Sequence, residues 1–256
     1  RASLVTVPDY MERLYAGLNF HNELGALNRL SNPEKPFVVI AGGLDASGKI
    51  DFMESFLDSA DTFLVSGAPG NVLYSVTGRE TGKTELDTDA VYKAKKFISS
   101  CEARGIRLAL ADDVVAIRSN LKNEPSSFII SGDRVPKESA IVDIGPETRA
   151  YYARIISNAK TVLWYGAPGD CEERWSSGGT EETASALTSS EAYGIVIGEE
   201  TVTRLNRLGC GEGTGYLSAG GDAAVKYLRD KTLPVVSALE SKIHEKTLRS
   251  RQLEDE

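Results

Sequence analysis

The sequence predicts an α/β fold in which a parallel sheet of about six strands carries helices on both faces. Short apolar runs alternate along the chain with segments of helical periodicity. The runs are continuously apolar, which is typical of parallel strands that are buried on both sides. In such a Rossmann-like sheet, ligands bind beyond the carboxyl ends of the strands. The runs expected to form strands are 37–41, 62–65, 107–111, 140–144, 161–165 and 194–197.

Three segments between these runs are expected to be helices. Apolar residues recur on one helical face from 87 to 102. A second helix is expected from Pro146 to about residue 159, because proline is favoured at the first helical position. The pattern over 9–30 predicts a lead-in helix, which ends before Pro33.

Composition narrows the classes of function. With 256 residues and 41% hydrophobic content, the chain can bury one large core or two modest ones. A formal charge of -8 disfavours nucleic acids and anionic membranes as partners, and no apolar stretch is as long as a bilayer span. Cys101, Cys171 and Cys210 fit reduced thiols, and two histidines, His21 and His244, are too few for a histidine metal cluster. The expected location is intracellular, in the cytoplasm or an associated compartment.

The most informative segment is the glycine turn at 42–49, which follows the first expected strand and opens a helix. Unpaired N–H groups and the positive dipole end at a helix start form an anion site, and glycines let a phosphate approach the backbone. Lys49 adds a cation, whereas Asp45 would repel the same phosphate. Two plainer readings stay open, in which Gly42 and Gly43 form only a tight turn and Lys49 is a surface lysine.

Further motifs occur along the chain, in order and at characteristic spacing. Together with the turn at 42–50, they resemble the C-terminal, nucleotide-binding domain of the phosphoglycerate kinase family over nearly the whole chain. The matching segments are Arg1-Ala2-Ser3, Asp143-Ile144-Gly145-Pro146-Glu147-Thr148, Lys160-Thr161-Val162-Leu163-Trp164 with Gly166 and Glu172, and Ser218, Gly220-Gly221 and Leu233-Pro234.

The resemblance implies a division of the chain and a set of site residues. Residues 1–30 would form a hinge and lead-in helix, 31–240 the nucleotide-binding domain, and 241–256 a charged tail. The family transfers a phosphoryl group between ATP and 3-phosphoglycerate with magnesium, and its triose-binding half has no counterpart here; it would lie upstream in a longer parent or be absent. The residues implied are Lys49 for catalysis, Glu200 (or Glu199) for the metal, and Gly42, Gly43, Gly67, Gly166, Glu172, Gly198, Gly220 and Gly221 for the nucleotide.

The sequence departs from the family pattern where the phosphates would lie. One lysine of the family turn is replaced, an asparagine has become an aromatic residue, and carboxylates stand in glycine positions. Loss of one such phosphate donor typically costs about 3–4 kcal/mol of transition-state stabilisation. Glu199 and Glu200 also fit ordinary acids of a first helical turn. The degenerate positions are Asp45, Gly48, Tyr165, Glu199 and Asp222.

These departures lead to a main hypothesis and two alternatives. The main hypothesis is a catalytically inactive pseudoenzyme domain that assembles with, or regulates, a protein partner, and that needs no cofactor. The first alternative is a regulatory module that binds ADP or ATP. The second is the nucleotide half of a divergent active kinase, which would require Mg²⁺ and ADP or ATP.

Overall fold

The computed structural model describes residues 10–11, 13–120, 123–131, 133–169 and 174–242. In this part of the chain, the main sheet has six strands and every pair of neighbours is parallel. The α/β prediction is therefore confirmed. In spatial order, the strands are β11 (Tyr216–Leu217), β10 (Tyr193–Ile197), β9 (Thr161–Tyr165), β1 (Phe37–Ala41), β2 (Thr62–Val65) and β4 (Arg107–Ala109).

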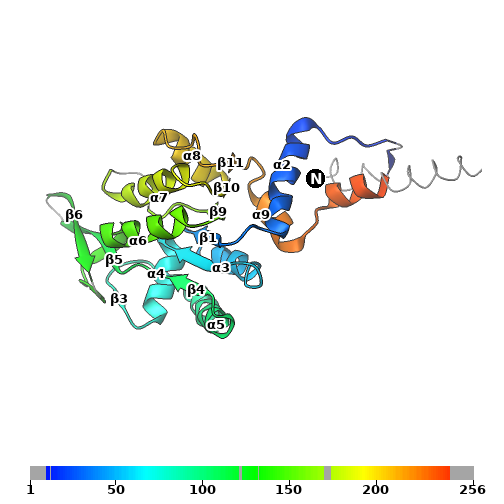
Figure 1. Ribbon diagram of the computed structural model, residues 1–256. Coiled ribbons are helices and arrows are strands. Elements are labelled where there is room, and N and C mark those ends of the chain that lie inside the picture. The colour runs from blue at the N-terminus through cyan, green and yellow to red at the C-terminus, as the bar shows by residue number, and fades with distance from the viewer. Residues whose placement is uncertain (1–9, 12, 121–122, 132, 170–173, 243–256) are drawn as a thin grey trace, which may run out of the picture.

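Helices cover both faces of the sheet because each central strand is apolar on both sides (Figure 1). In β1, Phe37, Val39 and Ala41 face one core, while Val38 and Ile40 face the other. The first core lies under α3 (Ala46–Glu54), α4 (Gly67–Val76), α5 (Thr88–Arg104) and α9 (Asp222–Asp230), and the second under α6 (Pro146–Ser157), α7 (Gly178–Thr188) and α8 (Glu199–Arg207).

The strand register brings the carboxyl ends of four strands to one edge. Ala41 at the end of β1 is level with Val65 of β2 and with Tyr165 of β9, and Ile197 of β10 is level with Tyr165. The glycine turns that follow these strands therefore meet, as the sequence predicts.

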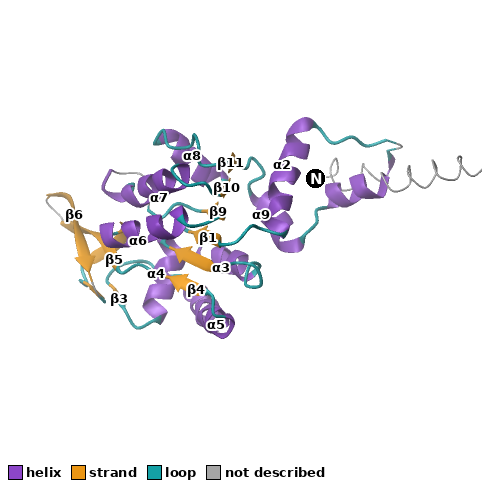
Figure 2. Cartoon of the chain, viewed as in Figure 1, coloured by secondary structure: helices purple, strands orange, loops and turns teal. Residues whose placement is uncertain are grey.

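The run at 140–144 is a strand, but its predicted place in the main sheet is wrong. It forms most of β8 (Ser139–Ile144), which pairs with β5 (Asp113–Asn120) in an antiparallel sheet completed by β6 (Asn123–Ser131). Figure 2 shows this sheet at the end of the molecule remote from α2. An apolar run specifies burial but not its pairing partner, and β5–β6 offers a hairpin edge close in sequence. A small pair, β3 (Glu80–Thr81) and β7 (Arg134–Val135), lies beside it.

The lead-in helix is shorter than predicted. Helix α2 spans Leu18–Asn28 and continues as the 3-10 turn η2 (Arg29–Ser31), while the described residues between 13 and 17 are not helical. Tyr15 and Leu18 are more than four-fifths exposed, so no packed surface supports an earlier helix start. Residues 241–242 belong to a further helix that begins at 234, and the rest of the expected tail lies outside the described residues.

The two other predicted helices are confirmed with small shifts. Asp87 caps α5 by accepting the N–H groups of Asp89 and Ala90, and Gly105 ends it in the left-handed conformation at φ 66°. Helix α6 begins at Pro146 and ends at Ser157.

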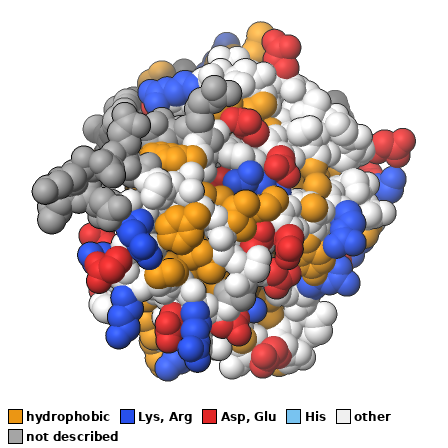
Figure 3. Space-filling view, turned by 90° about the vertical axis from the view of Figure 1, so that its left-hand side faces the viewer, with side chains coloured by type: hydrophobic (Ala, Val, Ile, Leu, Met, Phe, Trp, Pro, Cys, Tyr) orange, Lys and Arg blue, Asp and Glu red, His pale blue; other side chains and the backbone are white. Residues whose placement is uncertain are grey.

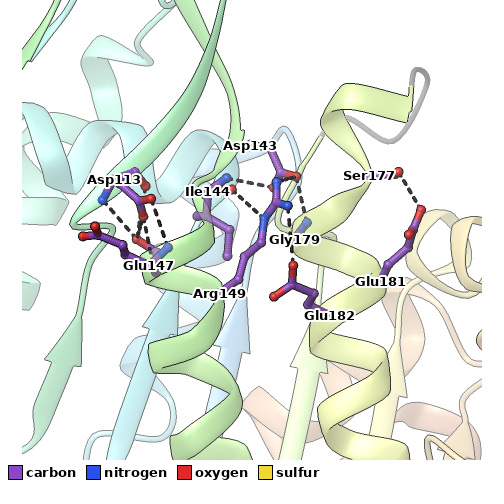
Figure 4. Close-up of polar contacts among 10 residues, drawn as sticks. Asp113, Asp143, Ile144, Glu147, Arg149, Ser177, Gly179, Glu181 and Glu182 are labelled. Carbon is purple, nitrogen blue, oxygen red and sulfur yellow. Dashed lines mark hydrogen bonds and ion pairs between the residues drawn. The ribbon is translucent and has the colours of Figure 1, made fainter. Parts of the chain in front are cut away.

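The cap of α6 comes from a residue distant in sequence. The buried Asp113 carboxylate accepts the N–H groups of Glu147 and Thr148 at 3.0 and 2.8 Å (Figure 4). A Cβ on Gly145 would lie 2.2 Å from this carboxylate, so glycine is required there. The cap fastens the antiparallel sheet to the main one.

The surface carries charges of both signs. On the face in Figure 3, acidic and basic side chains are interspersed around a group of apolar side chains, without a broad basic area. Among the helices of the described residues, none combines the length and the apolar character needed to cross a membrane.

Candidate functional site

The glycine turns at the sheet edge are in backbone contact with one another. The N–H of Gly42 donates to the Tyr165 carbonyl at 3.1 Å, and the N–H of Gly43 donates to the Ala167 carbonyl at 2.8 Å. A Cβ at Gly42 would lie 2.4 Å from the Ala167 oxygen, and one at Gly67 would lie 2.7 Å from the Gly43 nitrogen. These glycines are therefore needed for packing, whether or not a ligand is bound.

Lys49 is not a surface lysine. The residue is only 7% exposed, and its ammonium lies 2.9 Å from the centre of the Tyr165 ring. Burial lowers the pKa of Lys49 to about 8, against the opposing effect of Asp45, Glu200 and Asp222. Among the described residues, no carboxylate forms an ion pair with Lys49, so its charge is met only by the ring and by more distant acids.

Asp45 is built into the start of α3. It is the N-cap residue, and its Oδ1 accepts the N–H of Gly48 at 2.9 Å. A Cβ at Gly48 would lie 2.1 Å from the other carboxylate oxygen, so the two substitutions fit each other. A negative group of the chain itself therefore sits at the helix end where an anion would bind.

Helix α8 brings both acids and arginines to the same place. Gly198 precedes the helix at φ 98°, and Glu199 and Glu200 lie in its first turn. The Glu200 carboxylate accepts a hydrogen bond from Arg204 at 2.8 Å. Thr201 Oγ1 accepts the N–H of Gly166 at 3.0 Å and so joins α8 to the turn after β9.

These groups surround one cavity with a volume of about 710 Å³. A second cavity of about 270 Å³ adjoins it and shares Asp45, Tyr165 and Asp222. The larger one is hereafter called the edge cavity. Its lining includes Leu44, Asp45, Lys49, Tyr165, Gly166, Gly198, Glu199, Glu200, Thr203, Arg204, Arg207 and Asp222.

The carboxylates of the edge cavity do not form a metal site by themselves. Within the described ranges, no group of three or more histidine, cysteine, aspartate or glutamate residues is arranged to hold a metal ion. Glu200, the expected metal ligand, is engaged with Arg204. A bound Mg²⁺ would therefore need ligand oxygens from a nucleotide as well as from Glu200 or Glu199.

The remaining predicted residues lie around this edge. Gly220 and Gly221 precede α9, and Gly221 is its N-cap residue at φ 50°. Glu172 and Cys171 lie outside the described residues. Cys101 and Cys210 are free thiols, as predicted.

The sequence analysis did not predict that Glu23 would connect α2 to the loop before α9. Its carboxylate accepts hydrogen bonds from the Tyr216 hydroxyl at 2.8 Å, from the Ser218 hydroxyl and from the Ala219 N–H. It therefore ties α2 to the loop that carries Gly220. Arg204 and Arg207 were also missed, although their spacing of three residues places both on one helical face.

A second polar cluster lies outside the edge cavity, where Asp143 joins β8 to the N-terminus of α7 (Figure 4). Its fully buried carboxylate accepts hydrogen bonds from the Gly179 N–H at 2.8 Å and from Arg149 at 3.0 Å. Burial raises the pKa of Asp143 to about 6, although these hydrogen bonds and the Arg149 charge act against the rise. The cluster thus fixes the first turn of α7.

We expect this carboxyl to give the free energy of unfolding a pH dependence. Because its pKa is raised on folding from 3.8 to about 6, its contribution to stability is present below about pH 4 and is lost as the pH rises through about 6. Denaturant titration of the wild type and of Asp143→Asn at several pH values measures the contribution of Asp143 to the free energy of unfolding. The difference between them should change across pH 4–6 and stay level above pH 7; a constant difference throughout would contradict the assignment.

Taken together, a doubly wound parallel sheet with a ligand-sized cavity beyond its strand ends places the chain in the class of Rossmann-like α/β domains. The family model described as "PGK: Phosphoglycerate kinase" matches residues 1–231. The chain belongs to the phosphoglycerate kinase family.

Individual relatives agree with this assignment. A phosphoglycerate kinase of Herpetosiphon aurantiacus is 36% identical over 228 residues, covering 89% of this chain and 58% of the relative. One from Akkermansia muciniphila is 34% identical over 246 residues, covering 94% of this chain and 61% of the relative. The structure of phosphoglycerate kinase from Coxiella burnetii superposes with a TM-score of 0.88 at 31% identity, covering 94% of this chain and 62% of that one. The chain thus spans about three fifths of the length of these relatives.

Proposed function

We propose that this domain keeps the nucleotide-half fold of its family but does not transfer phosphoryl groups, and that it serves assembly or regulation with a protein partner. The observation that carries the proposal is the Asp45 carboxylate, which caps α3 and accepts the Gly48 N–H. A phosphate at that helix start would lie against a negative charge. At about 4 Å, two like charges repel by roughly 4 kcal/mol at an effective dielectric of 20.

Two further groups support the loss of transfer. The Tyr165 ring covers the Lys49 ammonium, and Glu200 is paired with Arg204. A lysine that must leave an aromatic ring and a carboxylate that must leave an arginine are poorly prepared to stabilise a transferring phosphoryl group.

The second candidate is a domain that binds ADP or ATP with Mg²⁺, either as a regulator or as half of a divergent active kinase. It is favoured by the edge cavity, whose volume of about 710 Å³ lies within the range of small-molecule sites and whose wall still includes Lys49 and Glu200. In that case Lys49 would contact the phosphates and Glu200 would hold the magnesium.

Thermal unfolding with Mg-ADP separates the two. A ligand at 100 times its dissociation constant stabilises a protein by about 2.7 kcal/mol, which is readily measured. We expect no upward shift at micromolar Mg-ADP and little at millimolar concentrations. A clear shift at micromolar nucleotide would contradict the first proposal in favour of the second.

Reversing the substitutions at the expected phosphate position tests whether they cause the weak nucleotide binding. We expect Asp45→Lys to bind Mg-ADP roughly 10-fold more tightly than the wild type, because it replaces a repulsive charge by an attractive one. A triple variant that adds Tyr165→Asn and one glycine before Glu199 should bind more tightly still. Calorimetric titration at two salt concentrations measures both.

Asp45→Asn is the matched control for the repair, because asparagine keeps the helix cap and removes only the charge. We expect its affinity to lie between those of the wild type and Asp45→Lys. If the triple variant folds but binds Mg-ADP no more tightly than the wild type, the substitutions at the phosphate position are not the cause of the weak binding.

A further inference from the structure

A separate cavity lies at the opposite end of the main sheet from the edge cavity. Its wall includes a row of three residues that the strand register places side by side, namely Val38 of β1, Thr62 of β2 and Arg107 of β4. All three are at the amino ends of their strands, so we call this hollow the amino-end cavity. Its volume of about 420 Å³ lies within the range of small-molecule sites.

Helix α6 covers this row. Tyr151, Arg154, Ile155 and Asn158 recur at spacings of three and four residues, so they share one face of the helix, and all four line the cavity. Tyr151 and Ile155 pack against the same core to which Val38 belongs. The inner part of the amino-end cavity is therefore an apolar extension of that core.

The amino-end cavity is positively charged in a chain that is acidic overall. Arg107 and Arg154 line it, and none of the described residues in its wall is acidic. The edge cavity, by contrast, has four carboxylates in its wall, and the whole chain has a formal charge of -8. A hollow with two arginines and no carboxylate favours an anionic ligand.

The two arginines have no charged partner of their own. In the part of the chain that the structure describes, neither guanidinium forms an ion pair or a hydrogen bond, and Arg154 lies over the Tyr151 ring at 5.7 Å. Both residues are exposed, so their guanidinium groups stand at the mouth of the cavity. Their donors are thus available to a ligand.

Thr62 offers one more polar group inside the cavity. It is only 7% exposed, and its hydroxyl forms no hydrogen bond with any of the described residues. The preceding Asp61 carboxylate does not serve it, because that group accepts hydrogen bonds from Lys35 and from the Phe37 N–H. A ligand oxygen in the cavity can therefore pair with the Thr62 hydroxyl.

We propose that the amino-end cavity binds a small carboxylate whose body is apolar and about the size of one ring. The carboxylate accepts hydrogen bonds from Arg107 and Arg154, since guanidinium groups match the planar geometry of a carboxylate. The body packs between Val38 and Ile155, where a fully hydrated anion would gain nothing. The site lies away from the edge cavity, so the proposal is independent of the proposed function.

The end of α6 makes the arginines indispensable. Asn158 is the C-cap residue, and the carbonyl end of a helix disfavours a nearby anion. The Asn158 amide donates to the Arg154 carbonyl at 2.7 Å and so satisfies one of these carbonyls. The attraction for a carboxylate must therefore come from the two guanidinium groups.

Benzoate, with one ring and one carboxylate, is the probe. In an NMR titration of the wild type, the amide resonances of Val38, Thr62 and Ile155 should shift with a millimolar dissociation constant. Arg107→Gln and Arg154→Gln should each weaken binding by about 10-fold, because each removes a hydrogen bond to a charged group. Both positions are exposed, so we expect the variants to fold, which circular dichroism checks.

Arg134→Gln is the matched control, because Arg134 is an exposed arginine that begins strand β7 as Arg107 begins β4. It should bind benzoate as the wild type does. Benzamide keeps the ring without the charge, and inorganic phosphate keeps the charge without the ring. Each should bind to the wild type several-fold more weakly than benzoate.

Four outcomes would overturn the proposal. The first is the absence of wild-type shifts at tens of millimolar benzoate, and the second is unchanged affinity in both Arg107→Gln and Arg154→Gln. The third is phosphate binding as tight as that of benzoate, which would show an anion patch without an apolar subsite. The fourth is a set of shifts confined to the surroundings of Lys49 and Tyr165, which would place benzoate in the edge cavity instead.

Discussion

Gly166→Ala should destabilise the domain by roughly 3–5 kcal/mol, because two costs add. Gly166 has a φ of 99°, which side chains rarely tolerate, and a Cβ there would lie 2.1 Å from the Gly42 carbonyl oxygen. The neighbour is backbone and belongs to the turn after the central strand β1, so it cannot move aside without disturbing the sheet edge. At roughly 2–4 °C per kcal/mol, the melting temperature should fall by about 10 °C.

Gly209→Ala separates the two costs. Gly209 also has a positive φ of 67°, but a Cβ there would meet nothing within 4 Å. This variant should lose only about 1–2 kcal/mol, which is the conformational part. Chemical denaturation of both variants measures the difference, and equal losses would mean that the contact between the two turns adds nothing.

Lys49→Met should stabilise the folded domain at pH 7. A pKa lowered from 10.5 to about 8 means that folding disfavours the charged lysine by about 3 kcal/mol. The contact with the Tyr165 ring, at 2.9 Å, offsets up to about 2 kcal/mol of this cost, and part of that contact is retained by methionine. We therefore expect a net gain of about 1–2 kcal/mol.

The sign of the pH dependence checks the cause of this gain. Because folding depresses the pKa of Lys49, the favourable contribution of the neutral lysine is present above about pH 10.5 and is lost as the pH falls through about 8. The advantage of Lys49→Met should thus shrink as the pH rises from 8 toward 10.5. Lys95→Met, at an exposed position of α5, should change stability little at any pH.

A less stable Lys49→Met variant would show that the ring and the nearby acids favour the ammonium by more than burial disfavours it. A more stable variant would instead show that the wild type retains a buried charge at a cost to its stability. That combination is typical of binding sites, in which a strained or desolvated group waits for its ligand.

Much of the fold was predictable because it rests on local pattern. Continuously apolar runs gave five of the six strands of the main sheet close to their bounds, and only the two-residue strand β11 was too short to be recognised. Helix α5 was predicted because its cap, its apolar face and its terminal glycine all lie within the helix or next to it. The run at 140–144 was misplaced, because strand pairing depends on which edge is free in three dimensions.

The candidate site was likewise predictable only in part. The sequence determined the family, the sheet edge with its glycine turns and the positions at which carboxylates replace the expected groups. Only the tertiary structure decided that Asp45 caps α3, that Tyr165 covers Lys49 and that the last turn of α8 brings Arg207 to the same cavity. Residue type and spacing fix what a side chain can do, whereas its charge state and partners depend on burial and on neighbours that lie far away along the chain.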